Sequence, residues 1–173
     1  MRAAVLGLPL TIAIIGGQPV RFKPLVELYD RVWEESGHAP EDRRLAINTH
    51  AFVGSTRAEA DSAFAQPYLT MMNRIGRERG WPPSGREQYE ALTAPDGAVA
   101  VGSPEQVAEK ILMEHELFSN QRYVGQISVG AVPHADVMRA IELFGSEVAP
   151  LVRDEIARRE PPVRPEPVTV VSD

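Results

Sequence analysis

The 173-residue sequence contains no cysteine, which excludes disulfide bonds, thiolate nucleophiles and zinc sites built on cysteine. The same absence fits a reducing compartment, and we expect the protein in the cytoplasm. A basic surface is also missing, because the net charge is -6 and the densest basic run, Arg74 to Arg79, carries an interleaved acid. A chain with this charge repels phosphates, so we expect no nucleic-acid partner.

No run of apolar residues is long enough to predict a membrane span. The apolar segment near the N-terminus is preceded only by Arg2, is broken by Pro9 and ends at Gly16, without a small-residue cleavage pattern. We therefore expect a core strand there, neither a signal peptide nor a transmembrane helix. No membrane partner is expected.

Several signatures of well-known active sites are absent as well. The sequence has no G-x-G-x-x-G, no Walker loop, no G-x-S-x-G elbow and no H-E-x-x-H, and we expect no metal site. Ser103 follows a short apolar segment, as a nucleophile would, but Pro104 and Glu105 after it predict a helix cap instead.

What the sequence does contain is an alternation of strand and helix signals. Apolar runs predict four strands: 8–15, 44–53, 98–101 and 123–129. The first reads as a strand buried on both faces. Helical spacing of apolar residues follows the first, second and third strands and returns from Val137 to about Arg159. This order predicts an α/β fold with a parallel sheet of three or four βα units, too few for a closed barrel of eight.

Local signals refine this outline. Thr56 and Glu59 predict a capping box, and Pro67 and Pro150 predict a break or bend in their helices. Trp81 lies in a polar stretch between Gly76 and Gly97, which leaves open a loop folded back onto the protein or the rim of a binding site. We expect one domain over residues 1–160, and a disordered, proline-rich tail over 161–173.

Two features point to a binding site at the carboxyl ends of the strands, where parallel sheets place their ligands. Gly16 and Gly17 end the first strand, and glycines let a backbone approach a ligand, although they also make simple tight turns. His50 lies late in the second strand and His134 at a helix start. Either histidine could have a functional role in that site or be a neutral, hydrogen-bonded structural residue.

Four segments in order carry a family resemblance: LGLPLTIAIIGGQPVRFKPLVELY, IGRERGWPP, VGSPEQVAEKI and VPHADVMRAIELFGSEVAPLVR. Together they resemble the C-terminal part of the bacterial luciferase-like flavin-dependent monooxygenases, over roughly Arg2 to Arg158. Members of that family are (β/α)8 barrels that hold reduced FMN, or a deazaflavin in some branches. The flavin reacts with oxygen at the carboxyl ends of the strands and oxidises a small organic substrate.

The resemblance implies roles for individual residues. It makes Leu8 to Gly17 the sixth barrel strand and its exit, Leu45 to Val53 the seventh strand and Tyr123 to Gly130 the eighth. The cofactor-binding residues beside the isoalloxazine ring or the ribityl chain would be Ala13, Ile14, Ile15, Gly16 and Gly17. The implied catalytic side chain is His50, which would line the substrate side of the pocket together with the helix start near His134.

The chain departs from the family because nothing in it corresponds to the first five strands. We therefore expect a partial (β/α)8 barrel, the C-terminal half, with two open sheet edges. Such a half would pair as a homo-oligomer or with a complementing N-terminal barrel half. The resemblance implies a flavin-dependent oxidoreductase or monooxygenase, incomplete or inactive as this fragment. The alternative is a non-enzymatic interaction or barrel-complementing protein.

Overall fold

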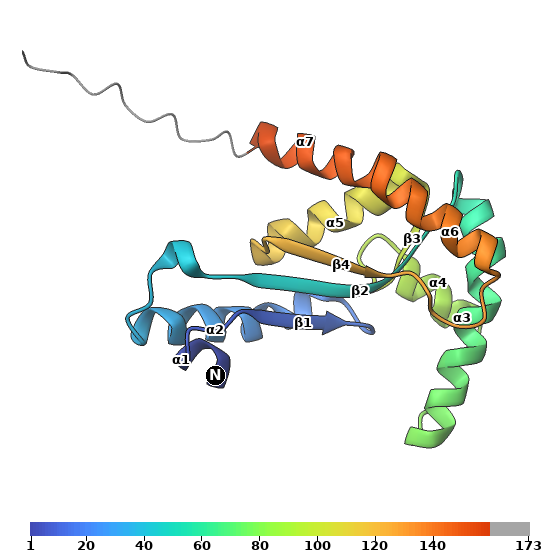
Figure 1. The fold of residues 1–173 in the computed structure, drawn as a ribbon. Helices are drawn as coiled ribbons and strands as arrows, with labels where there is room; N and C mark the ends of the chain where they lie inside the picture. The colour runs from blue at the N-terminus through green and yellow to red at the C-terminus, as the bar shows by residue number, and fades with distance from the viewer. Residues whose placement is uncertain (160–173) are drawn as a thin grey trace, which may run out of the picture.

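The computed structural model describes residues 1–159, and the predicted proline-rich tail over 161–173 lies outside that part. A parallel sheet crosses the middle of the molecule, and helices pack around it (Figure 1). Its strands are β1 (Leu10–Ile14), β2 (Leu45–Val53), β3 (Ala100–Gly102) and β4 (Arg122–Gln126).

Seven α-helices are present in the described part of the chain. They are α1 (Arg2–Val5), α2 (Lys23–Glu35), α3 (Arg57–Arg79), α4 (Arg86–Thr93), α5 (Pro104–Phe118), α6 (His134–Leu143) and α7 (Ala149–Arg159). Short 3-10 turns occupy Pro19–Phe22 and Pro40–Asp42, and a π-helical turn at Phe144–Val148 joins α6 to α7.

The long strand β2 organises the sheet. Its first part pairs in parallel with β1 on one side and with β4 on the other, so that Ala13, Asn48 and Val124 form one row across three strands. Its last part, Ala51 to Val53, pairs with β3. All pairings are parallel, which confirms the predicted α/β class. Within residues 1–159, β1 and β4 pair with β2 alone, so each has an open outer edge.

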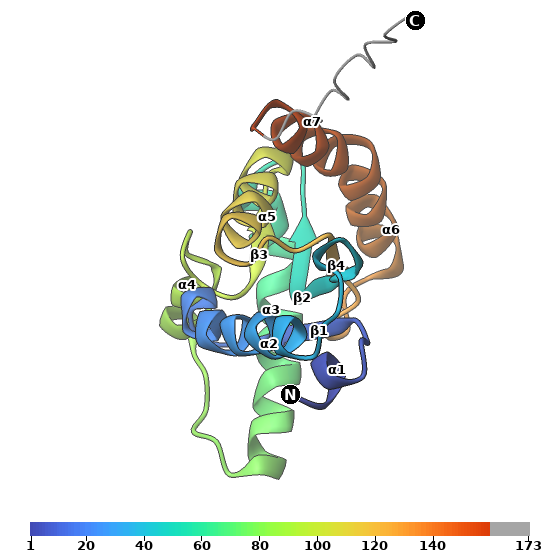
Figure 2. The ribbon, with the colours of Figure 1, turned by 90° about the vertical axis from the view of Figure 1, so that its left-hand side faces the viewer.

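Two helices cover one face of the part of the sheet formed by β1 and the first half of β2. Figure 2 shows α2 and α5 together on the same side of the strands. The apolar side chains between the sheet and these two helices form one buried cluster: Ile12, Ile14, Val26, Leu45, Ile47, Ala98 and Phe118. Because side chains alternate along a strand, this cluster takes every second residue of β1 and β2.

The prediction that the first strand is buried on both faces is wrong. Ile12 and Ile14 are buried, but Thr11 and Ala13, which alternate with them, are exposed. Val124 of β4, which lies in the same row as Ala13, is 40% exposed. The reason is that no element of the described residues covers this second face of β1, which we call the open sheet face (Thr11, Ala13 and Val124).

The local predictions were mostly confirmed. Thr56 caps α3 by accepting from the backbone N–H of Glu59, but the Glu59 carboxylate accepts from the N–H of Ser55, so the predicted capping box is incomplete. Ser103 forms a complete capping box with Gln106. Helix α3 continues through Pro67, so of the expected break or bend the break does not occur. The π-helical turn between α6 and α7 ends just before Pro150. This wider turn accommodates the proline.

Candidate functional site

A pocket of about 290 Å³ opens where β1 ends. Three segments that are distant in the sequence form its walls: the end of β1, one side of α3, and the stretch from the end of α3 through α4. The lining residues are Ile15, Gly16, Gly17, Tyr68, Leu69, Met72, Gly76, Trp81, Pro82, Ser84, Gln88, Tyr89 and Leu92. We call this the β1-end pocket.

The paired glycines form the wall from β1. Gly17 has a φ of +76°, a left-handed conformation that favours glycine, whereas Gly16 has no such requirement. A Cβ atom at either position would meet no protein atom within 4 Å. Packing within the described chain therefore gives no reason for glycine at position 16, and the space beside it is open to a ligand.

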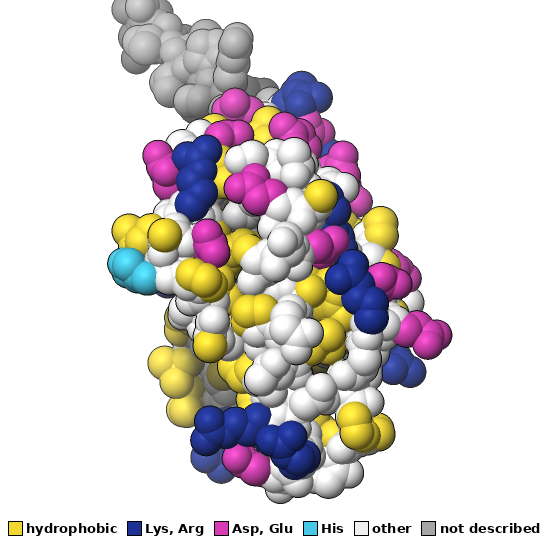
Figure 3. Space-filling view, turned by 90° about the vertical axis from the view of Figure 1, so that its right-hand side faces the viewer, with side chains coloured by type: hydrophobic (Ala, Val, Ile, Leu, Met, Phe, Trp, Pro, Cys, Tyr) yellow, Lys and Arg dark blue, Asp and Glu magenta, His cyan; other side chains and the backbone are white. Residues whose placement is uncertain are grey.

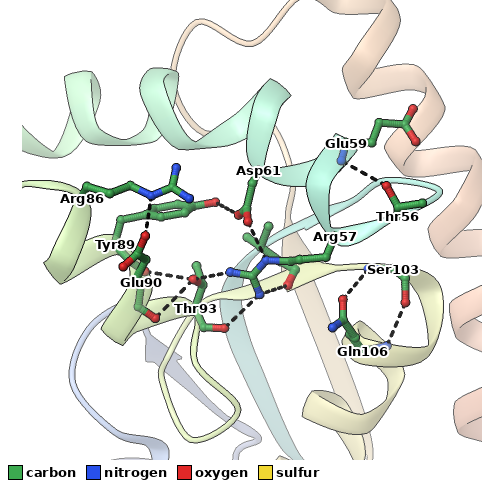
Figure 4. A network of polar contacts seen from close by, with 11 residues as sticks. Thr56, Arg57, Glu59, Asp61, Arg86, Tyr89, Glu90, Thr93, Ser103 and Gln106 are labelled. Carbon is green, nitrogen blue, oxygen red and sulfur yellow. Dashed lines mark hydrogen bonds and ion pairs between the residues drawn. The ribbon is translucent and has the colours of Figure 1, made fainter.

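A polar network fixes α4 against α3 and so shapes the opposite wall (Figure 4). The Tyr89 hydroxyl donates to Asp61 at 2.8 Å, and Asp61 forms an ion pair with Arg57 at 2.8 Å. Arg57 also donates to the backbone carbonyl of Val101 and to the side chain of Thr93. Because these contacts hold Tyr89 fully buried, the pocket wall that it forms is preorganised.

The loop between α3 and α4 closes the outer side of the pocket. Asn73 on α3 makes two hydrogen bonds with the backbone of Ser84, one to its carbonyl and one from its N–H. Trp81 is 46% exposed, with the guanidinium of Arg79 over its ring. The loop is therefore folded back onto α3, which is one of the two alternatives left open by the sequence, and Trp81 also lies at the rim of the pocket.

The pocket lining is uncharged. Its residues include no Asp, Glu, Lys or Arg side chain, and apolar groups predominate. Figure 3 looks onto the end of the molecule toward which β1 points, and there hydrophobic side chains are exposed in the centre while charged ones lie mostly toward the margins. An uncharged wall of this kind suits a flat or apolar ligand.

Tyr68 supplies an unused polar group in this wall. Its side chain is 1% exposed, and its hydroxyl has no hydrogen-bond partner within residues 1–159. Burial raises the pKa of Tyr68 to about 12, so the hydroxyl stays protonated at neutral pH and can donate. A buried, unpaired hydroxyl is costly to a fold, and this one lies behind the pocket surface, where a bound molecule does not reach it.

His50 lies next to Tyr68 and not in the pocket lining itself. The two rings meet edge to face, with centroids 5.7 Å apart, and His50 is 5% exposed. Its Nδ1 atom has no hydrogen-bond partner within residues 1–159. Burial lowers the pKa of His50, so the ring is neutral at neutral pH. His134 begins α6, is exposed and lies outside the pocket lining.

The structure separates the five residues expected beside the cofactor. Ile15, Gly16 and Gly17 line the pocket. Ala13 is exposed on the open sheet face. The side chain of Ile14 is fully buried in the cluster beneath α2, so it faces away from the pocket.

Sequence reasoning missed the residues from α3 and α4. Tyr68 and Met72 follow the helical stripe of α3 and read as ordinary core positions, and Tyr89 lies in a stretch that reads as polar. Trp81, a large apolar residue in that stretch, was the one available signal. Within residues 1–159 there is no group of three or more His, Asp and Glu side chains that could hold a metal, and no helix is long and apolar enough to cross a membrane.

Comparison with known proteins identifies the family. The model of the luciferase-like monooxygenase family matches residues 1–121. The chain belongs to the luciferase-like monooxygenase family. No curated protein sequence matches this member of the family.

Several solved structures have a similar fold. The monooxygenase RslO1 from Streptomyces bottropensis is 19% identical, with a TM-score of 0.67 over 86% of this chain and 43% of its own. The oxygenating constituent of 3,6-diketocamphane monooxygenase from Pseudomonas putida, solved with FMN, is 20% identical, with a TM-score of 0.61 over 87% of this chain and 44% of its own. The coenzyme F420 dependent tetrahydromethanopterin reductase from Methanopyrus kandleri is 18% identical, with a TM-score of 0.53 over 81% of this chain and 44% of its own.

The luciferase-like chain therefore spans less than half the length of these structures. Its three neighbouring parallel strands and their helices form part of a (β/α)8 barrel, which confirms the predicted partial barrel.

Proposed function

We propose that this chain forms one side of the active site of a flavin-dependent oxidoreductase or monooxygenase. The observation that carries the proposal is the β1-end pocket, in which Gly16 faces open space at the carboxyl end of a barrel strand. The named cofactors of the similar structures, FMN in one and coenzyme F420 in another, support a flavin-type cofactor. Reduced FMN is our proposal, with a deazaflavin as the other choice, and we propose that the protein works in the cytoplasm.

The residues present fit the ring system of a flavin better than its phosphate. The backbone around Ile15, Gly16 and Gly17 can approach a flat ring without a side chain in the way. No lysine or arginine lines the pocket, so a phosphate would find no cation there. We expect Ala13 and Ile14 to contribute to flavin binding only indirectly, as part of strand β1, which positions the turn at Gly16 and Gly17.

When bound, reduced flavin would supply two electrons, and oxygen would deliver one atom to a small organic substrate and the other to water. His50 is our candidate catalytic side chain. Its ring is buried and neutral, and its unpaired Nδ1 could accept or return a proton. Tyr68, whose ring contacts His50 and which lines the pocket, would position this histidine.

The proposal is tested by titrating the full chain with riboflavin and with FMN, which differ only by the phosphate. We expect weak binding of both, with similar dissociation constants. Quenching of flavin fluorescence measures the binding. Gly16→Val should weaken both several-fold, because its side chain occupies the space against the ring. Gly145→Val is the matched control, since a Cβ atom at Gly145 also meets open space but lies in the π-helical turn, away from the pocket.

Two results would contradict the proposal. One is unchanged flavin binding by Gly16→Val, which would place the flavin elsewhere. The other is sub-micromolar binding of FMN but not of riboflavin, which would require a phosphate site in this chain.

The open sheet face favours a second candidate function, a non-enzymatic protein that completes a barrel with another chain. Exposed Thr11, Ala13 and Val124 and the open edges of β1 and β4 support it. The partner would be a second copy or a complementing N-terminal barrel half. Size-exclusion chromatography tests the idea, because a stable monomer that binds riboflavin would favour the enzymatic proposal alone.

A further inference from the structure

A second pocket lies beside the start of β4, at the amino end of the parallel strands and on the side of the sheet that the helices cover. Its volume is about 300 Å³, and its walls come from α5, β4, the π-helical turn and α7. Figure 1 shows α5 and α7 running alongside β4. We call it the α5–α7 pocket. Within the described chain it has no lining residue in common with the β1-end pocket, so a molecule bound there would not occupy the proposed flavin site.

The body of the α5–α7 pocket is apolar. Its apolar and aromatic side chains come from all four walls: Ile111, Tyr123, Phe144, Val148, Val152 and Ile156. The ring of Phe144, in the π-helical turn, stacks on that of Tyr123 with centroids 6.2 Å apart. The Tyr123 hydroxyl is already hydrogen-bonded to the side chain of Thr49, so this ring offers a ligand only its apolar surface. A cavity of this volume holds a compact molecule of roughly ten non-hydrogen atoms.

The charge on the wall of this pocket is positive. Arg122 and Arg153 belong to the lining, whereas no Asp or Glu among residues 1–159 does. Within the same residues, neither guanidinium forms an ion pair or a hydrogen bond. Farther along α7, Arg158 and Arg159 both pair with Glu155. The two arginines of the lining therefore present positive charge that the described chain does not neutralise.

The buried carboxyl group of Glu114 does not cancel this charge. Burial raises the pKa of Glu114 to about 8, so the group is mainly neutral at neutral pH.

The backbone that carries Arg122 is held in place by its neighbours. The ring of His115 on α5 donates from Nδ1 to the carbonyl of Asn120 at 3.0 Å. The side-chain amide of Asn120 in turn donates to the carbonyl of Arg122, also at 3.0 Å. These contacts fix the turn into β4 against α5, so the position from which the Arg122 side chain starts is preorganised.

We propose that the α5–α7 pocket binds an organic anion with a compact apolar body, such as a medium-length or aromatic carboxylate. The apolar side chains would enclose the body, and Arg122 and Arg153 would donate to the carboxylate, whose geometry matches that of a guanidinium. The bound anion would contact α5, β4 and α7 at once and would hold the final helix against the rest of the molecule. The site is independent of the proposed flavin-dependent function.

Three probes with the same hydrocarbon chain test the proposal: octanoate, octanamide and octylammonium. Their head groups are an anion, a neutral amide and a cation. Binding to the full chain is followed by NMR of isoleucine methyl groups. The signals of Ile111 and Ile156 report on the α5–α7 pocket and that of Ile15 on the β1-end pocket, and each is assigned by substitution with valine.

We expect octanoate to shift the Ile111 and Ile156 signals and to bind about three- to tenfold more tightly than octanamide, with octylammonium the weakest. Added salt should reduce this preference. Replacing both arginines of the lining, by Arg122→Gln with Arg153→Gln, should abolish the preference and leave octanamide binding unchanged. Both side chains are exposed, so this variant should fold normally.

The matched control is Arg21→Gln with Arg31→Gln. It removes the same net charge from two exposed arginines that also lack a partner within residues 1–159 but lie outside the pocket lining. This variant should keep the preference for octanoate.

Three results would overturn the proposal: octanamide binding as tightly as octanoate, a preference that survives the loss of Arg122 and Arg153, or octanoate shifts confined to Ile15. A fourth is a shift of the Ile111 and Ile156 signals with protein concentration alone. That result would show that a second copy of the chain covers the pocket.

Discussion

Glu114 lies on the buried side of α5 and is 1% exposed. Both of its carboxylate oxygens lack a hydrogen-bond partner within residues 1–159. Burial raises the pKa of Glu114 from its ordinary value of 4.5 to about 8, although the positive charge of Lys110 opposes the shift. A carboxyl group in this position is held neutral by its surroundings.

Stability should therefore depend on pH through this residue, while His50 acts in the opposite direction below pH 6.5, because its lowered pKa means that the unfolded chain binds more protons there. Between pH 4.5 and pH 8 the folded protein holds a proton that the unfolded chain has released, so the free energy of unfolding should fall as pH rises through that window. The loss should be on the order of a few kcal/mol. Burial also lowers the pKa of Lys110 to about 8, but its effect on the slope begins above that pH.

Urea denaturation of Glu114→Gln between pH 5 and pH 8 checks this prediction. The variant should give a flatter pH profile than the wild type and should be the more stable protein at pH 8. Glu109→Gln, an exposed position on the same helix, should keep the wild-type profile. An unchanged slope in Glu114→Gln would show that another group is responsible.

At the scale of elements, helix starts were predictable because their signals are local. Thr56 and Ser103 each act on backbone N–H groups two or three residues away, and both cap the helices that the sequence predicts. Of the break or bend expected at Pro67, the break does not occur, since α3 continues through it. A proline removes a backbone donor wherever it stands, but only the packing around the helix decides whether the helix ends there.

The attachment of α4 to α3 depends on Tyr89. Tyr89→Phe removes the hydroxyl that donates to the Asp61 carboxylate, and we expect a loss of roughly 1.5–3 kcal/mol in the free energy of unfolding. Hydrogen exchange should show lower protection in α4 than elsewhere. Tyr29→Phe should also cost stability without this local effect, because its hydroxyl bonds to the backbone near β1. Uniform loss of protection in Tyr89→Phe would mean that α4 does not open separately.

At the scale of the whole molecule, the main feature is a sheet whose strands β1 and β4 leave one face uncovered. Val124 and Ala13 occupy one row of the open sheet face, with Asn48 between them. Apolar side chains and two open strand edges on one surface favour association with other β-structure.

We expect the chain to self-associate or to bind a complementing barrel half, and Val124→Lys to reduce this association by placing a charge in the interface. Sedimentation velocity measures it directly. Leu151→Lys on α7 is the matched control, because Leu151 is 42% exposed, similar to the 40% of Val124, but lies outside the sheet. A wild-type chain that stays monomeric at high concentration would contradict the prediction.

The sequence by itself determined the order of strands and helices, the caps and, through four ordered segments, the family. These depend on periodicity and on neighbours within a few residues, which can be read directly along the chain. Only the tertiary structure decided that Tyr68, Trp81 and Tyr89 meet Gly16 in one pocket, and that β1 is buried on one face. Such contacts depend on how α3 and α4 pack over the end of the sheet, and no local pattern encodes that packing.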